Sequence, residues 1–277
     1  MLFTLNLMNN FLNKSILSGS LKSARQFLFW RAKFKGGINI NNKKKISADC
    51  KDMWNAFMVK GANFPPNGIG IPLCPTTAHE LPRELISYTE ARATYNRRIR
   101  RGDKNFFVNA FVHFYQHDHK FDGARCGIWI APRRAAEIFR HFAGIITPDF
   151  STNIDFPFPW KIFNTYRMRA FGYWYGTLGG AVINNVRWGE EDTFSWCFEG
   201  IAKNSIVSIG TVASGLRNHE NRKLFEIGFE KLLEVSNPHT IIVYGSDNLP
   251  CFNSVCQKVN IVNFQSERAL AFERASL

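Results

Sequence analysis

The 277-residue sequence lacks the features that define several large classes of protein. No apolar run reaches the ~18 residues that a spanning helix needs, so no membrane span is expected. A P-loop pattern and a G-x-S-x-G turn are both absent, and nucleoside triphosphate hydrolysis and α/β-hydrolase chemistry therefore have no support. None of the six cysteines has a partner at the two-residue spacing of a zinc knuckle or redox motif. Free thiols in a reducing compartment are the expected state.

Acidic residues are missing from the first 48 residues, which hold nine lysines and arginines. Nine of the 13 net positive charges therefore belong to this segment. We interpret residues 1–50 as a basic, flexible leader and residues 51–277 as one α/β domain. Two alternatives stay open for the leader. The first is a mitochondrial presequence, whose amphipathic, acid-poor composition it shares. The second is a start codon assigned too far upstream, since Met53 could begin a self-sufficient domain.

Strand-like and helix-like runs alternate from residue 105 onward. Strands are expected at 106–115, 145–147, 181–186, 205–209, 240–244 and 261–264, and helices at 133–142, 159–176, 192–198 and 221–235. The connections are long enough for parallel crossovers, which need a dozen or more residues. The pattern predicts a mainly parallel α/β sheet of about six βα units. An open doubly wound sheet and an incomplete TIM-like barrel both fit it.

Polar residues follow four of these strands. The carboxyl ends of parallel strands meet at one edge of a sheet, where ligands of such folds bind. We therefore predict one site there. Its predicted catalytic residues are Asp149, Asn185 and Arg187, and its predicted ligand-binding residues are Asn164, Arg167, Thr211, Ser214, Gly245 and Ser246.

Four of these residues have two possible roles each. Asp149 would be a base or a metal ligand, and Arg187 would hold an anion. Alternatively, Asp149 is an ordinary turn residue and Arg187 pairs with Glu190 or Glu191 at the surface. Asn164 and Arg167 lie on the helix expected at 159–176, where they would either reach the strand ends or brace the loop after Asp149.

Two further groups carry charge. A capping box at Ser87–Glu90 predicts a helix that ends at Gly102. Its arginines are interpreted as a solvated surface, with contact to nucleic-acid phosphates as the alternative; they are Arg97, Arg98, Arg100 and Arg101. The histidines and carboxylates of residues 113–122 lack a recognisable ligand set, so no metal is assigned and they are expected to face solvent. Which cofactor, if any, the protein uses stays unknown from the sequence.

Eight ordered blocks resemble the uncharacterised domain-of-unknown-function family 4417. They include IPLCPTT (71–77), GIITPDFS (144–151), NTYRMRAFGYW (164–174), NNVRWG (184–189) and TIIVYGS (240–246). The likeness covers about residues 52–272 and implies an origin in phages, plasmids or bacterial mobile elements, with no established activity.

Two functions are expected from the residues together with this resemblance. The first is an enzyme that acts on a phosphorylated or nucleotide-like ligand at the strand ends. The second is a non-catalytic nucleic-acid-binding accessory protein of replication or host defence evasion. The expected location is the cytoplasm of a host cell, or the mitochondrion if the leader is a presequence. Whether the protein is an enzyme and what its oligomeric state is stay open.

Overall fold

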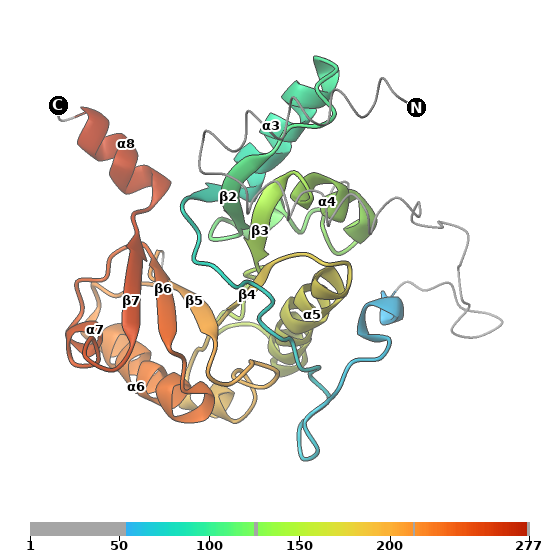
Figure 1. Cartoon of the computed structure of the whole chain (residues 1–277). Helices are drawn as coiled ribbons and strands as arrows, with labels where there is room; N and C mark the ends of the chain where they lie inside the picture. Colours follow the sequence, from blue (N-terminus) through green and yellow to red (C-terminus); the bar gives the residue numbers. More distant parts are fainter. Residues whose placement is uncertain (1–53, 125–126, 213, 276–277) are drawn as a thin grey trace. The chain divides into compact units, whose positions relative to one another are not determined.

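A parallel β-sheet organises the part of the chain that the computed structural model describes, residues 54–124, 127–212 and 214–275 (Figure 1). The leader predicted at residues 1–50 lies outside these ranges. All neighbouring strands pair in parallel. The strands are β1 (Leu85–Ser87), β2 (Val108–His113), β3 (Phe142–Ile146), β4 (Val182–Asn185), β5 (Ile206–Gly210), β6 (Thr240–Tyr244) and β7 (Asn260–Phe264).

The order of the strands in the sheet is the same as their order along the chain, from β1 to β7. A doubly wound sheet reverses its strand order at a switch point, and no reversal occurs among these strands. The sheet curls into a half-barrel with alternating helices. The predicted α/β class is confirmed, and the incomplete barrel is the alternative that the structure supports.

Helices connect the strands, and several begin at residues with good capping chemistry. The side-chain oxygen of Ser87 accepts a hydrogen bond from the Glu90 backbone N–H at 3.4 Å, as the capping box predicts. Asn218 caps the Glu220 and Asn221 amides in the same way. The helices are α3 (Tyr88–Arg100), α4 (Pro132–Phe139), α5 (Phe158–Thr177), α6 (His219–Ser236), α7 (Pro250–Asn253) and α8 (Glu267–Ala275), with 3-10 turns η1 (Ala56–Val59), η2 (Asp118–Lys120) and η3 (Glu191–Ser195).

Alternation along β5 shows how the two faces of the sheet differ. Val207 and Ile209 point to one face and pack in a hydrophobic cluster that includes Phe229 of α6. Ile206 packs in a second cluster on the other face. Ser208 is buried on the same face as Ile206 and forms a hydrogen bond with Tyr115. The second face is therefore apolar at the start of β5 and polar toward its carboxyl end.

Two boundaries differ from the sequence prediction. The helix expected at 133–142 ends at Phe139, and residues 142–144 belong to β3. Gly144 suggested a helix end, but its role is close packing: a Cβ there would lie 2.4 Å from the Phe111 ring. The helix expected at 192–198 is the 3-10 turn η3. Strand β1 was not predicted, because three residues are too few to show an alternating pattern.

The sequence predicts that no helix spans a membrane and that the cysteines are free thiols. Among the described helices, none is long and apolar enough to cross a membrane. The four cysteines within the described ranges are free thiols: Cys74, Cys197, Cys251 and Cys256.

Candidate functional site

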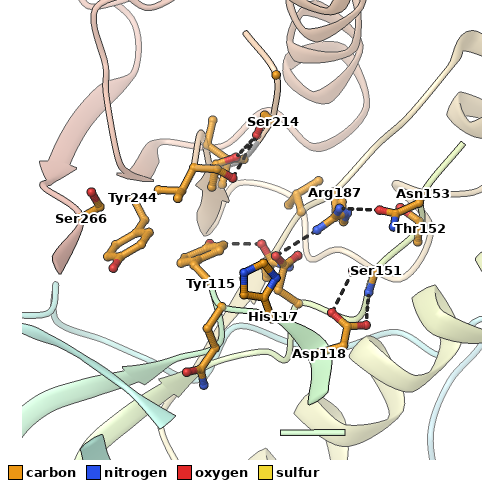
Figure 2. Close-up of a pocket in the computed structure, with 18 of the residues that line it drawn as sticks. Tyr115, His117, Asp118, Ser151, Thr152, Asn153, Arg187, Ser214, Tyr244 and Ser266 are labelled. Carbon is orange, nitrogen blue, oxygen red and sulfur yellow. Dashed lines mark hydrogen bonds and ion pairs between the residues drawn. The ribbon is translucent and has the colours of Figure 1, made fainter. Parts of the chain in front are cut away.

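A cavity of about 1130 Å³ opens at the carboxyl ends of the strands (Figure 2). Residues after β2, β3 and β4 line it, together with the end of β5, the segment after β5 and Tyr244, the last residue of β6. Ser87 at the end of β1 and residues 266–268 after β7 also line it. The cavity is therefore built by the whole curled sheet, at the edge where ligands of related architectures bind.

A hydrogen-bonded network crosses this cavity from β5 to the loop after β4. The Tyr115 hydroxyl lies 2.7 Å from Ser208 Oγ and 3.1 Å from Asn185 Oδ1. Asn185 Nδ2 donates to Asp149 Oδ1 at 2.8 Å, and Arg187 Nη1 donates to Asp149 Oδ2 at 3.1 Å. The network therefore joins residues that belong to or follow four different strands.

The charged end of the network is only partly shielded from solvent. The Arg187 side chain is 32% exposed, whereas that of Asp149 is 14% exposed. Arg187 Nη2 also lies 3.4 Å from Asn153 Oδ1 (Figure 2). The alternative pairing of Arg187 with Glu190 or Glu191 is not the arrangement found, because its carboxylate partner is Asp149. A guanidinium has five N–H donors, so these contacts leave capacity to bind an anion in the cavity.

The middle of the network is an aromatic group. The rings of Tyr115 and Tyr244 stack with centroids 5.0 Å apart, and His113 lies 4.3 Å from Tyr244. Burial, together with the negative charge of Asp149, raises the pKa of Tyr115 well above its usual value. Tyr115 is therefore a neutral hydrogen-bonding group. A Cβ at Gly210 would lie 2.7 Å from the Tyr115 ring, so glycine at that position makes room for it.

A second set of contacts braces the rim of the cavity. Asp118 accepts hydrogen bonds from the Ser151 N–H at 3.0 Å and Oγ–H at 2.8 Å (Figure 2). Asn164 Nδ2 donates to the Ser151 carbonyl. Arg167 donates to Asn164 Oδ1 at 2.6 Å and binds both oxygens of Asp122 at 2.9 and 2.8 Å. Of the two roles considered for Asn164 and Arg167, the structure therefore places them as a brace of the loop after Asp149.

A buried cation stands behind the network. Arg169 is fully buried and donates to three backbone carbonyls, those of Asn185, Cys197 and Glu199. Burial lowers its pKa to about 10. Its hydrogen bond to the Asn185 carbonyl helps to fix the strand end that presents Asn185 to Asp149.

The predicted site residues fall into two groups. Asp149, Asn185, Arg187 and Ser214 line the cavity. The others support it from outside its lining. Thr211 Oγ1 donates to the Ser246 carbonyl at 2.9 Å and ties the loops after β5 and β6 together. Gly245 adopts a φ of +117°, which favours glycine. The functional roles of all these residues stay predictions.

Several cavity residues were missed at the sequence level. Tyr115, Asp118 and Tyr244 line the cavity with the 3-10 turn η2. Tyr115 lies two residues beyond the end of β2, so the strand-end rule that selected Asp149 also applies to it. The expectation that the cluster at 113–122 faces solvent is wrong for His113, which is 1% exposed because the end of β2 is covered by Tyr115 and Tyr244. His117 and His119 do lie at the cavity.

Neither metal ligands nor a nucleic-acid surface is defined by these contacts. No group of three or more histidine, cysteine or carboxylate side chains in the described ranges could hold a metal ion. Arg97 pairs with Glu90 at 3.6 Å and Arg98 with Asp103 at 3.1 Å, both at the surface. Arg100 and Arg101 are also exposed.

Most of the fold and of the cavity lies in a region shared with other proteins. Residues 67–265 match the family described as "Domain of unknown function (DUF4417)", and the chain belongs to this family. It is 31% identical over 135 residues to the "Gene 1 protein" of Mycobacterium phage L5, covering 48% of this chain and 56% of that protein. It is 30% identical over 135 residues to the "Gene 1 protein" of Mycobacterium phage D29, covering 48% of each.

The match therefore spans about half the length of these curated relatives. No solved structure matches the chain. The resemblance noted in the sequence is confirmed, and the family is a phage-associated one of unknown function. The mitochondrial alternative for the leader has no support from these matches.

Proposed function

We propose that the cavity binds a phosphorylated or nucleotide-like ligand through Arg187. The observation that carries the proposal is the joining of residues from four strands into one network, which ends on a partly exposed guanidinium in a cavity of about 1130 Å³. Asp149 fixes one side of Arg187, so its orientation is set before a ligand arrives. Preorganised donors of this kind hold an anion at little conformational cost.

The roles proposed for a reaction follow from the same contacts. Arg187 clamps the anion, while Asn185 and Arg187 hold the Asp149 carboxylate. Asp149 accepts one hydrogen bond from each of them. A carboxylate accepts roughly four, so lone pairs remain with which Asp149 acts as the base. Catalysis is tested separately from binding. The protein is incubated with pyrophosphate, ribose 5-phosphate or a nucleoside monophosphate, and phosphorus NMR identifies any products. Products formed equally by the wild type and Asp149→Asn would contradict this role.

Binding is tested with Arg187→Ala and a matched control, Arg140→Ala. Arg140 directly follows α4, and its Nε lies 3.1 Å from the Glu137 carboxylate. Its side chain is 38% exposed, similar to that of Arg187, but it does not line the cavity. Pyrophosphate, ribose 5-phosphate and the four common nucleoside monophosphates serve as probes in calorimetric titrations at fixed ionic strength. Loss of charge-assisted hydrogen bonds should weaken binding roughly ten- to hundredfold in Arg187→Ala only. Equal affinities of the two variants would refute the proposal.

A second candidate is binding of nucleic acid by α3. It is favoured by Arg100 and Arg101, which are exposed and have no acidic partner within the described ranges. Phosphate contacts make such binding strongly dependent on salt, so the dependence of affinity on ionic strength separates this candidate from the first.

A further inference from the structure

The segment that ends β4 alternates between polar and apolar side chains. Asn185 and Arg187 both bind Asp149 in the polar network. Val186 instead belongs to the hydrophobic cluster formed with α6, and Trp188 packs against this cluster. All four line the cavity. The period of two in an extended segment thus gives the cavity a charged part and an adjoining apolar part.

We define the apolar wall as the hydrophobic side chains that line this second part. They come from the end of β4, from β5, and from the loop and first turns of α6: Val186, Trp188, Ile209, Leu216, Leu224 and Phe225. The Trp188 and Phe225 rings lie 5.0 Å apart. Gly228 of α6 makes room for Trp188, since a Cβ there would lie 2.2 Å from the indole ring. The indole is therefore held in place by packing.

Polar groups border the apolar wall. Asn221 and Ser214 also line the cavity. Asn221 uses its Nδ2 to donate to the Gly215 carbonyl at 3.3 Å, which leaves its amide oxygen as an acceptor. A purely aliphatic ligand would gain nothing from this acceptor, whereas a nucleobase has a flat apolar face and a polar edge with N–H donors. The volume exceeds that of common drug-sized pockets and can contain both parts of such a ligand.

We infer that the ligand is a nucleoside phosphate whose base lies against the apolar wall and whose phosphate is held by Arg187. This inference rests on the proposed function and divides the same cavity into two subsites. Contact between a base and aromatic side chains strengthens binding by about 1–3 kcal/mol per base, which corresponds to roughly five- to hundredfold in affinity. A nucleoside monophosphate should therefore bind at least about fivefold more tightly than ribose 5-phosphate, which lacks the base.

The test compares calorimetric affinities for ribose 5-phosphate and for AMP, GMP, CMP and UMP in the full-length protein and its variants. Trp188→Ala removes the largest side chain of the apolar wall. Leu216→Ser is a milder change in a half-buried loop residue and carries the test if Trp188→Ala does not fold. Leu233→Ser is the matched control, because Leu233 packs against the same hydrophobic cluster but does not line the cavity. Thermal melts check the folding of each variant.

The expected result is that Leu216→Ser, and Trp188→Ala if folded, lose most of the preference for the nucleotide while ribose 5-phosphate affinity stays within about twofold. Leu233→Ser should keep the preference. Two results would overturn the base subsite and leave the proposed function standing: ribose 5-phosphate binds the wild type as tightly as every nucleotide, or Leu216→Ser and Leu233→Ser keep the same preference. Absence of binding by all probes, pyrophosphate included, would overturn both.

Discussion

His113 at the end of β2 makes the stability of the domain sensitive to acid. Its side chain is 1% exposed and lies against the rings of Tyr115 and Tyr244. The Nδ1 atom accepts a hydrogen bond from the Tyr115 N–H at 3.2 Å, so the neutral ring carries its proton on Nε2. Nε2 has no hydrogen-bond partner in the described part of the chain. Protonation would put a hydrogen on Nδ1, where it would face the Tyr115 N–H. Two donors would then oppose each other, and neither would have an acceptor.

The direction of the pH effect follows from this environment. Burial lowers the pKa of His113 from the ordinary 6.5 to about 3. The unfolded chain therefore binds more protons than the folded chain between these two values, and the free energy of unfolding decreases as the pH falls below 6.5. Each pH unit inside this window costs about 1.4 kcal/mol. Between pH 7.5 and pH 5 the loss from His113 alone should be about 2 kcal/mol.

Urea unfolding at pH 7.5, 6 and 5 measures this loss in the wild type and in His113→Asn. Asparagine keeps an acceptor for the Tyr115 N–H and does not titrate. His141, whose pKa is also lowered by burial, contributes equally to both proteins and cancels in the comparison. The wild type should lose about 2 kcal/mol more than the variant over this range. Parallel pH profiles for the two proteins would show that the pKa of His113 is the same in the folded and unfolded chain, as for a solvated side chain.

Three further changes have distinct expected outcomes. Gly210→Ala should displace the Tyr115 ring, cost about 1–3 kcal/mol of stability in urea unfolding and weaken ligand binding; unchanged stability would mean that the ring moves freely. Arg167→Met should cost about 3–5 kcal/mol, because it leaves the partly buried Asp122 without its cation; a loss below about 1 kcal/mol in the same assay would contradict the brace. Replacing Arg97, Arg98, Arg100 and Arg101 by Gln should reduce the salt slope of any DNA binding by about 0.9 for each phosphate contact; an unchanged slope would assign these arginines to a solvated surface.

The fold could be predicted from the sequence because local signals and topology agree. The run Thr240–Tyr244 was expected as a strand and is β6 with the same bounds. The helix expected at 159–176 is α5, Phe158–Thr177. Errors occurred where a single residue has two uses. Gly144 is such a case, since a glycine ends helices and also permits close packing in a sheet. Barrel and doubly wound sheets have the same alternating pattern, so strand order had to come from the structure.

The site was predictable only as far as the strand-end rule reaches. The rule placed Asp149, Asn185 and Arg187 together, because it depends on chain direction and not on side-chain packing. It also selected Thr211 and Ser246, which do not line the cavity and instead form a hydrogen bond between the loops after β5 and β6. No local pattern shows which of two neighbouring side chains after a strand points into the cavity.

Arg167 and Arg187 illustrate this limit with the same type of side chain. Each forms an ion pair with an aspartate after a strand, at 2.8 Å and 3.1 Å. Arg167 lies under the Phe150 ring, with its guanidinium carbon 3.8 Å from the ring centre, and its side chain is 10% exposed. Its two terminal nitrogens donate to Asp122 and Asn164 and are therefore committed to the fold. Arg187 has three times that exposure and faces the cavity. The difference arises from the aromatic packing around α5, which only the tertiary structure reveals, and it separates a residue that supports the site from one that can bind a ligand.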